Sequence, residues 1–418
     1  MSGNGGPVTR KPKLVLVGSG RNVYREYIFD ALSAEVDLRL LDDRPTGWRG
    51  RYVEDHVVSD LTFDRAVEAL HEEWARGRVD GIMTFEEQSV ELAASLTRHF
   101  DLPGPTPEAV HRARDKHRMR SVWNTAGVRS ARSELVASGQ EAVRAAEELG
   151  YPVVVKPRSL AASAGVSLAK GPEEVADSYA RAAGARLTRY AVEEGAGVLV
   201  EEYLEGPEYS VEAVVSGTEL VPLAVTEKVT GPLPLFEEKA HVVGPVEQWH
   251  RPMVEVVDSA VRALGLRDTV VHAEVRLTPS GPAMIELGAR IAGDMIGYLV
   301  DRATGTSISR LNARVALGDQ VSATETGPAG QDRRYAGVEF VYAPAAGKLR
   351  GFELAEEHST RPWVDRVVRA LDPGTEVAAP EQGGVGSRIG YVVVTGWSPE
   401  QVRARLREVS EAVEVLVD

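Results

Sequence analysis

Cysteine is absent from this chain of 418 residues, which excludes disulfides, thiolate zinc sites and a cysteine nucleophile. Aromatic residues are scarce, at 6%. No apolar run approaches the roughly 18 residues that would span a bilayer, so we expect no membrane contact. The first residues, MSGNGGPVTRKPK, have no apolar segment behind their basic residues and read as a disordered leader rather than a signal peptide. We therefore expect a cytoplasmic protein.

Lysine is also scarce, because only eight of the 48 basic residues are lysine and the others are arginine. A lysine in an unusual context is therefore more informative than it would be in most chains. The net charge of -14 argues against binding to a phosphate backbone, so no nucleic-acid partner is expected. The length predicts about two to four domains, and the proportions of 43% hydrophobic and 26% charged residues are typical of globular proteins.

The first part of the chain alternates buried strands with helices, which predicts a small doubly wound α/β unit over residues 10 to about 112. Its GSG turn fits a phosphate contact and a plain helix start about equally well. Glu86 and Glu87 follow a strand's carboxyl end, where they could face a crevice or cap a helix. The expected strands are KLVLVGSGRN (13–22), VDLRLLDD (36–43) and VDGIMTF (79–85).

The middle of the chain predicts elements joined by loops of unusual composition. DLPGPTPEAV (101–110) is a proline-rich linker, and a helix dense in positive charge then ends at Gly127. Residues 228–250 are rich in proline and glycine, so we expect a long loop there, and such loops are usually functional. The other expected elements are a helix at 141–149, strands within 151–170, 198–217 and 219–227, a helix at 305–317, and a tail of short strands that ends in a helix at 398–411.

Lys156 ends the apolar strand YPVVVK and is followed by the loop RSLAASAG, whose side chains are mostly small. Backbone N–H groups of such a loop can approach a ligand closely, which favours phosphate binding, although the pattern differs from GxxxxGK[ST]. The alternative is a strand-end lysine that extends to water. For the helix that carries Arg114, Lys116, Arg118 and Arg120, a solvated cationic face is the simpler interpretation.

Two glutamates on neighbouring strands raise the question of what lies between them. Glu274 and Glu286 are joined by the turn TPSG, and strand geometry can place both on one face. Like charges so close require a cation. Mg²⁺ fits best, since it takes hard oxygen ligands and fills its other positions with water and phosphates. The alternative is a pair of glutamates that form salt bridges with Arg276 and Arg290.

Two more pairs are candidates. Glu201 and Glu202 are adjacent in the strand VLVEEYL, so at least one should face a crevice. Glu238 and His241 stand in EEKAH, within the expected loop. A surface histidine is the simplest interpretation, and a zinc site would need a third ligand that the nearby sequence does not supply.

The order of these elements resembles the ATP-grasp superfamily of carboxylate–amine ligases over nearly the whole chain. The motifs that carry the resemblance are DKHRM, VVVKPRSLAASAGV, EEYLEGPEYSVE, HAEVR and IELGARIAGD. The resemblance implies an α/β protein with α+β grasp lobes. It would have a doubly wound pre-ATP-grasp domain at 1–112, a two-lobed ATP-grasp domain with a small lobe at 113–200 and a large lobe at 201–334, and a C-terminal α+β lid at 335–418.

The resemblance also implies a nucleotide site built from three of these motifs. Lys116 and Lys156 would face the phosphates of ATP, Glu201 would accept a hydrogen bond from the adenine amino group, and Glu208 would hold the ribose hydroxyls. The expected ATP-binding residues are Lys116, Lys156, Ser163, Gly165, Glu201, Tyr203, Leu204 and Glu208.

Glu274 and Glu286 would, by the same resemblance, hold Mg²⁺ against the ATP phosphates, with Mn²⁺ as a possible substitute. Arg290 would be catalytic and stabilise the charge that develops at the acyl centre. Gly288 stands where many members of the superfamily have asparagine, which leaves the number of metal ions open.

GARIAGD and the E-x-x-H pattern resemble most closely the L-amino-acid ligases that make dipeptides. This implies a catalytic role for His241 and a substrate-binding role for Glu238, His241, Gly293 and Asp294. Asp294 would meet a substrate ammonium group, or else cap a helix, which aspartate does well.

The implied activity is that of an ATP-dependent ligase. It would activate the carboxylate of an amino acid or similar molecule as an acyl phosphate and join it to an amine, releasing ADP and phosphate. The alternatives are a ligase similar to biotin carboxylase, a formyl-activating ligase, and a nucleotide-binding scaffold without turnover. The partners would be small molecules and, on the base rate for soluble proteins, a second copy of the chain. The sequence leaves open which carboxylate and which amine are joined.

Overall fold

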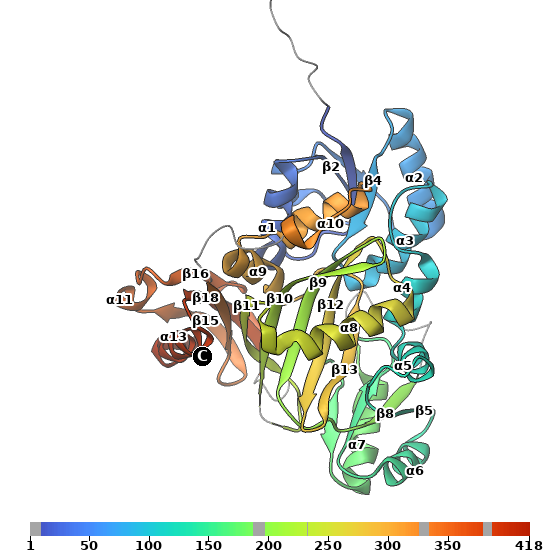
Figure 1. Cartoon of the computed structure of the whole chain (residues 1–418). Coiled ribbons are helices and arrows are strands. Elements are labelled where there is room, and N and C mark those ends of the chain that lie inside the picture. The colour runs from blue at the N-terminus through green and yellow to red at the C-terminus, as the bar shows by residue number, and fades with distance from the viewer. Residues whose placement is uncertain (1–9, 187–196, 232, 326–333, 379–386) are drawn as a thin grey trace, which may run out of the picture.

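The computed structural model describes residues 10–186, 197–231, 233–325, 334–378 and 387–418. The first nine residues of the expected leader lie outside this described part. The described residues form four sheets (Figure 1). None of the helices in these ranges is long and apolar enough to cross a membrane.

The N-terminal sheet is parallel, with the strand order β3-β2-β1-β4. β1 is buried along its whole length, and successive side chains pack on opposite faces. Leu14 and Leu16 pack toward α1, whereas Val15 and Val17 pack toward α2 and α3. Both faces are therefore covered, as a doubly wound unit requires. The elements are β1 (Lys13–Val17), α1 (Asn22–Ser33), β2 (Asp37–Asp42), β3 (Asp55–Val58), α2 (Phe63–Ala75), β4 (Gly81–Thr84) and α3 (Val90–His99).

The second sheet, of order β5-β8-β6-β7, is antiparallel, and α6 and α7 pack on one of its faces. Val153 and Val155 of β6 and Val198 and Val200 of β8 pack under α6 and α7. The intervening residues of these strands point to the opposite face. The elements are β5 (Ser133–Val136), α6 (Gly139–Leu149), β6 (Val153–Pro157), β7 (Ser167–Ala169), α7 (Pro172–Gly184) and β8 (Val198–Glu202).

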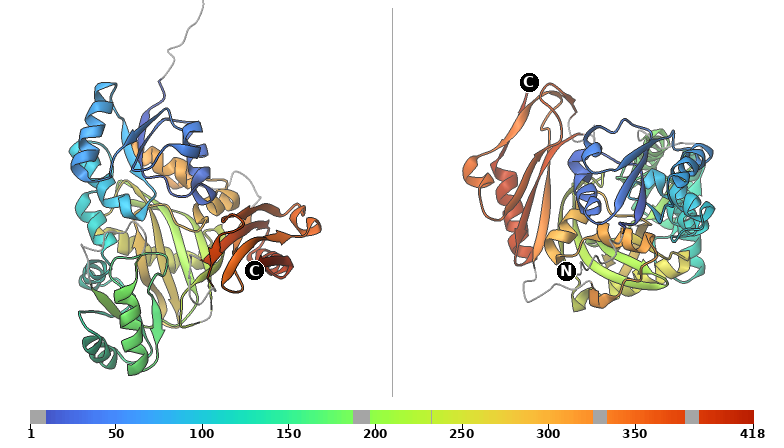
Figure 2. Two further views of the ribbon diagram at one scale, coloured as in Figure 1. Left: turned by 180° about the vertical axis from the view of Figure 1, so that it is seen from behind. Right: turned by 90° about the horizontal axis from the view of Figure 1, so that it is seen from above.

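The central sheet has the order β13-β12-β9-β10-β11-β14-β18-β16, so strands from the last part of the chain continue the sheet begun by β9 to β13 (Figure 1). Figure 2 shows that this last part projects to one side of the molecule. The strands are β9 (Glu208–Ser216), β10 (Glu219–Thr230), β11 (Glu238–Pro245), β12 (Thr269–Thr278), β13 (Gly281–Gly288), β14 (Tyr335–Tyr342), β16 (Val364–Arg369) and β18 (Arg388–Gly396).

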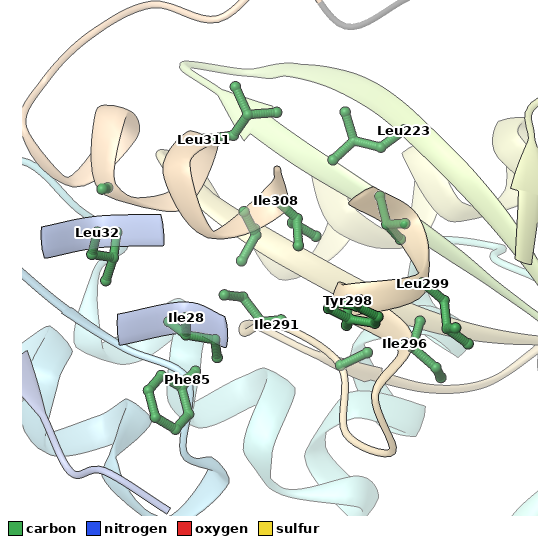
Figure 3. Packing of buried hydrophobic residues seen from close by; sticks show 14 of the residues in the cluster. Ile28, Leu32, Phe85, Leu223, Ile291, Ile296, Tyr298, Leu299, Ile308 and Leu311 are labelled. Carbon is green, nitrogen blue, oxygen red and sulfur yellow. The ribbon is translucent and has the colours of Figure 1, made fainter. Parts of the chain in front are cut away.

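A continuous apolar core joins the central sheet to the N-terminal sheet. α9 (Ile296–Thr304) and α10 (Ile308–Ala316) lie between the two sheets, and their residues Leu299 and Ile308 share one buried cluster with Phe85 and Leu223 (Figure 3). The helix expected at 305–317 corresponds to α10, and α9 precedes it in the chain. This packing fixes the N-terminal sheet against the central one.

The other face of the central sheet is covered by α8 and α5. Trp123 of α5 is fully buried there and donates a hydrogen bond from Nε1 to the backbone oxygen of Ala260 at 3.2 Å. The remaining elements are α4 (Pro107–Arg114), α5 (Lys116–Thr125), α8 (Arg251–Leu264), β15 (Gly347–Leu354), α11 (Glu356–Ser359), β17 (Glu376–Val377), α13 (Pro399–Ala412) and β19 (Val413–Val417).

Two expectations about local structure are wrong. The stretch 228–250, expected to be one long loop, contains the end of β10 and all of β11, which pair as antiparallel strands. Proline and glycine suggested a loop, but β11 places polar side chains inward and so lacks the apolar alternation of an ordinary strand. The single charge-dense helix is two helices, α4 and α5, which break at Asp115. The residue ranges of the four predicted domains stay predictions.

Replacing Trp123 with alanine should lower the free energy of unfolding by about 3–5 kcal/mol, because it leaves a cavity between α5 and α8. Urea unfolding followed by circular dichroism would measure this loss. Trp397, whose exposed fraction is 57%, provides the control, and Trp397→Ala should cost no more than about 1 kcal/mol. Equal losses in the two variants would contradict the assigned packing.

Candidate active site

A pocket lies between the second sheet and the central sheet, and most of the predicted site residues line it. One wall is the face of the second sheet opposite α6 and α7, the other is the central-sheet face that also carries α9 and α10, and α5 contributes Lys116 and Arg120. Among the residues that line the pocket are Lys116, Lys156, Ser163, Glu201, Tyr203, Leu204, Glu208, Lys228, Phe236, Glu238, Glu274, Glu286, Arg290 and Gly293.

Strand alternation explains the wall formed by the second sheet. Val153 and Val155 face α6 and α7, so Val154 and Lys156 face the pocket. Glu201 of β8 faces it for the same reason, with Lys156 Nζ 2.7 Å from its Oε2. Arg120 lies on the other side of this carboxylate, with its Nε 3.0 Å from Oε1. Burial raises the pKa of Glu201, but these two cations outweigh burial and lower it.

Lys116 is placed by the break between α4 and α5. Asp115 caps α5, since its side chain accepts hydrogen bonds from the backbone N–H groups of His117 and Arg118. Asp115 also accepts a 2.8 Å hydrogen bond from Nε of Arg158, which follows β6. The helix that carries Lys116 and the strand that carries Lys156 are therefore tied together at the pocket.

Glu274 and Glu286 are direct cross-strand partners on β12 and β13. Ala273 and Val275 pack on the apolar side of β12, which leaves His272, Glu274 and Arg276 on the pocket face. A bulge follows Glu274 in the pairing with β13 and shifts the register there, and bulges often aim side chains beside functional sites. The prediction that the two carboxylates share one face is correct.

These carboxylates pair with two lysines and a histidine, since Nε2 of His272 lies 3.3 Å from Glu274 Oε1. Lys116 Nζ lies 3.0 Å from Glu286 Oε1, and Lys228 contacts Glu274 Oε1. Arg276 pairs with Glu208 at 2.6 Å instead. The alternative of a salt bridge to Arg276 is therefore wrong. The facing oxygens form a hard donor set that suits Mg²⁺.

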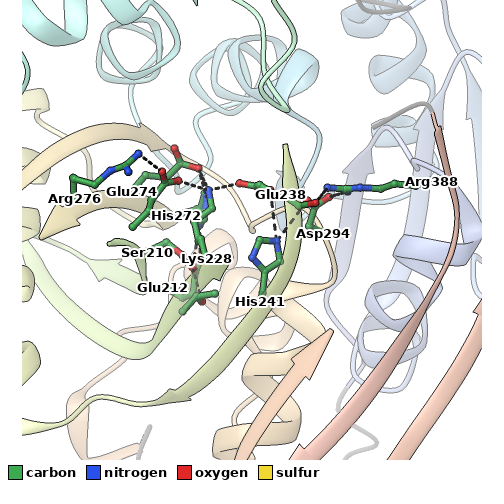
Figure 4. Close-up of polar contacts among 12 residues, drawn as sticks. Ser210, Glu212, Lys228, Glu238, His241, His272, Glu274, Arg276, Asp294 and Arg388 are labelled. Carbon is green, nitrogen blue, oxygen red and sulfur yellow. Dashed lines mark hydrogen bonds and ion pairs between the residues drawn. The ribbon is translucent and has the colours of Figure 1, made fainter. Parts of the chain in front are cut away.

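A second acidic cluster continues from the pocket along β11 (Figure 4). His241 Nε2 lies 3.5 Å from Glu238 Oε2 and 3.6 Å from Asp294 Oδ2. Arg388 of β18 donates a 2.7 Å hydrogen bond to Asp294 Oδ1 and a 2.8 Å one to the Glu238 backbone oxygen. Burial lowers the pKa of His241, but the two carboxylates outweigh burial and raise it.

Three simpler interpretations of this cluster are wrong. His241 is fully buried against Phe340 rather than on the surface. A third potential ligand does lie beside Glu238 and His241, because Asp294 completes a set whose ligand atoms all lie within 4.8 Å of one another. Asp294 does not cap α9, since the residue at the cap position is Met295.

Three predicted residues do not line the pocket, namely Gly165 and two members of the second acidic cluster, His241 and Asp294. Gly165 lies against α7, where an added Cβ would come within 2.6 Å of the Ala185 Cβ. Ser163, in contrast, lines the pocket, as do Tyr203 and Leu204 from the segment after β8. Glu202 points away from Glu201 and pairs with Arg132 at 2.7 Å, as adjacent strand residues should.

Glu86 and Glu87 have different surroundings. The carboxylate of Glu86 accepts a hydrogen bond from the Gly20 backbone N–H, so an acidic side chain occupies the GSG turn and disfavours phosphate there. Glu87 pairs with Arg290 and lies 3.3 Å from Arg114. Neither carboxylate caps the short helix that follows β4. The crevice interpretation therefore holds for Glu87, which touches the predicted catalytic arginine.

Four site residues were not assigned a role from the sequence, namely Glu87, Asp115, Lys228 and Arg388. Asp115 had an available signal, because aspartate before a helical pattern is a common cap. Lys228 had one too, as one of only eight lysines. Arg388 had none, since its partner Asp294 is 94 residues away in the chain.

Comparison with known families agrees with this geometry. The model of the ATP-grasp domain matches residues 149–297, and that of the L-amino acid ligase C-terminal domain 2 matches residues 339–418. The chain therefore contains an ATP-grasp domain and an L-amino acid ligase C-terminal domain. The superfamily and the fold class predicted from the motifs are thus confirmed.

Individual relatives of this ATP-grasp chain are distant. It is 27% identical over 337 residues to the protein y4rH of Sinorhizobium fredii, which covers 80% of this chain and 68% of the relative. It is 31% identical over 238 residues to alanine–anticapsin ligase of Bacillus subtilis, which covers 51% of this chain and 49% of the relative. The chain thus spans about half the length of that ligase.

The L-amino acid ligase of Bacillus licheniformis has a similar solved structure. The TM-score is 0.81, and the match covers 98% of this ATP-grasp chain and 99% of that one. At 22% identity, this match shows a shared fold.

Acid should weaken the pairing of Glu87. Burial raises the pKa of this carboxylate, but Arg290, Arg114 and Lys116 outweigh burial and lower it from 4.5 to about 2. A lowered pKa stabilises the folded state above about pH 4.5, and this stabilisation is lost as the pH falls toward 2. Glu87→Gln should therefore destabilise the protein by about 3 kcal/mol at pH 7 and by less at pH 3.5, measured by urea unfolding. A difference independent of pH would contradict the ion pair.

Proposed function

We propose that this chain uses ATP to activate the carboxylate of an amino acid and joins it to an amine, forming an amide or a dipeptide with ADP and phosphate. The observation that carries the proposal is the pocket itself, where Glu274 pairs across the strands with Glu286 and where Lys116 and Lys156 line the same space. Opposed carboxylates and lysines suit a magnesium nucleotide and little else.

The nucleotide would lie along the wall formed by the second sheet. Lys156 and Lys116 would bind its phosphates, and Glu201 would accept a hydrogen bond from the adenine amino group. The backbone of Tyr203 and Leu204 would meet the ring. Mg²⁺, held by Glu274 and Glu286, would neutralise charge on the phosphates. Glu208 would bind the ribose hydroxyls, with Arg276 2.6 Å away to orient its carboxylate.

The order of the chemical steps follows from the low reactivity of a carboxylate toward an amine. A carboxylate is a poor electrophile, so the γ-phosphoryl group of ATP is first transferred to it, and the amine then attacks the acyl phosphate and displaces phosphate. Arg290 would stabilise the oxyanion of the tetrahedral intermediate, held in place by Glu87. Ser163 stands in the small-residue loop near the phosphates.

The substrates would lie beside the second acidic cluster. Glu238 and Asp294 offer negative charge to a substrate ammonium group, His241 lies between them, and Gly293 has no side chain to obstruct it. The name of alanine–anticapsin ligase, which couples an amino acid, favours amino acid substrates here too. A cytoplasmic location and a homodimer stay predictions.

Acyl phosphates hydrolyse readily, so the pocket must exclude water during the reaction. The two segments that could close over it touch each other. The backbone N–H of Leu168, in β7 after the small-residue loop, donates a 2.9 Å hydrogen bond to the backbone oxygen of Pro234, in the turn between β10 and β11. We take these segments to be the lid.

A phosphate-release screen over pairs of amino acids, with products identified by mass spectrometry, tests the proposal. The expected result is ADP formation that requires both substrates, and Glu286→Gln should abolish it through loss of a metal ligand. Glu219→Gln, an exposed strand position, is the control and should keep full activity. Full turnover by Glu286→Gln would reject the metal role. Turnover with bicarbonate or formate would favour the other ligase classes, and nucleotide binding without phosphate release would favour a scaffold.

Lys156→Ala should cost about 2–4 kcal/mol of transition-state stabilisation, seen as a fall of at least roughly 30-fold in kcat/KM for ATP, because charge-assisted bonds to phosphate are lost. Glu201 keeps Arg120 as its partner, so the fold should persist. Lys170→Ala removes an exposed lysine and should leave kcat/KM unchanged. Similar kinetics for the two variants would contradict the phosphate role.

A further inference from the structure

The ammonium group of Lys228 is enclosed by three carboxylates. Its Nζ lies 3.2 Å from Glu208 Oε1 and contacts Glu238 Oε1 and Glu274 Oε1 more closely still. Only 2% of the Lys228 side chain is exposed. Figure 4 shows these contacts converging on the end of the lysine, at the boundary between the pocket and the second acidic cluster.

The strand register puts the lysine in this position. On β10, Lys228 is the direct cross-strand partner of Glu208 on β9 and of His241 on β11. Glu274 approaches from β12, on the far side of β9. Four neighbouring strands thus present their polar residues on one face, and Lys228 lies at the centre of this group.

The carboxylates around Lys228 have the spacing of a cation site. Their oxygen atoms all lie within 4.8 Å of one another, close enough for one ion to touch all three. Three carboxylates so close could not all stay ionised without a positive charge among them. An ammonium group and a divalent ion cannot occupy this volume together, because both need the same oxygens.

Among the other basic groups of the pocket, His272 also contacts Glu274, with Nε2 3.3 Å from Oε1, whereas the other two pocket lysines are paired elsewhere. Lys116 contacts Glu286, and Lys156 contacts Glu201. Arg276 contacts the outer oxygen of Glu208, so it does not replace the ammonium group. Gly288, two residues after Glu286, contributes no side-chain ligand to the pocket.

We propose that Lys228 is a built-in cation that takes the place of a second divalent ion, so that the pocket holds a single Mg²⁺, between Glu274 and Glu286. The position of that single ion rests on the proposed function, whereas the exclusion of a second ion by Lys228 does not. Lys228 is thus a positioning residue. It contacts one carboxylate oxygen of Glu274 and leaves the other oxygen to bind the single Mg²⁺.

Manganese binding to the nucleotide-free chain tests the exclusion directly. Titration with Mn²⁺, with free Mn²⁺ followed by electron paramagnetic resonance, should show that Lys228→Met binds one more ion per chain than the unmodified protein. Lys228→Arg keeps the charge and should gain none. Adding Glu238→Gln to Lys228→Met removes one ligand and should weaken the extra site at least tenfold.

Two results would overturn the proposal. A folded Lys228→Met chain that gains no Mn²⁺ would show that the three carboxylates do not form a cation site.

If that variant does not fold, the number of Mn²⁺ ions bound by the unmodified chain tests the proposal instead. Saturated with ADP, it should bind one Mn²⁺ per chain, and two bound ions would refute the substitution. A chain that binds no ADP would contradict the proposed function instead. In that case the number of Mn²⁺ ions bound by the unmodified nucleotide-free chain tests the proposal. If this chain binds an Mn²⁺ ion that the Glu238→Gln variant does not bind, an ion occupies the position of Lys228 and the proposal is refuted.

Discussion

The compensation of buried carboxylates by nearby cations is the constraint on which this structure depends. A carboxylate taken out of water costs several kcal/mol, roughly, unless a cation or hydrogen bonds replace the lost hydration. Each acidic group of the pocket has such a partner: Glu201 lies between Lys156 and Arg120, and Glu286 meets Lys116. The partners come from different sheets and helices, so the charges also hold the two walls of the pocket together.

The sheets make this arrangement possible because strand residues alternate. On β6, β8 and β12, one set of side chains enters an apolar core, and the other set projects into the pocket. The same residues that stabilise the fold therefore determine where the polar groups point. A helix at the same place would spread them around its axis. The bulge after Glu274 is the one local departure within the β12–β13 pairing.

Much of this could be predicted from local pattern. Apolar runs and caps indicated the doubly wound unit, β6 and β8, and the motifs indicated Lys116, Lys156 and the facing glutamates. The pattern failed at β11, where EKAHVVGP turns polar residues inward. It also could not pair residues far apart in the chain, such as Lys228 with Glu274, 46 residues away, or Glu87 with Arg290, 203 residues away. Those pairings depend on the order of strands and on packing between sheets, which no local spacing records.

Arg388 gives the site a property that concerns synthesis. It reaches Asp294 and the Glu238 backbone from β18, which lies in the sheet beyond β14. A growing chain that already contains both lobes of the pocket thus still lacks the cation that Asp294 requires. Domains fold largely in the order in which they are made, so this end of the site is completed last. Any chain that ends before β18, whether by early termination or by proteolysis, carries an acidic cluster with its charge unbalanced.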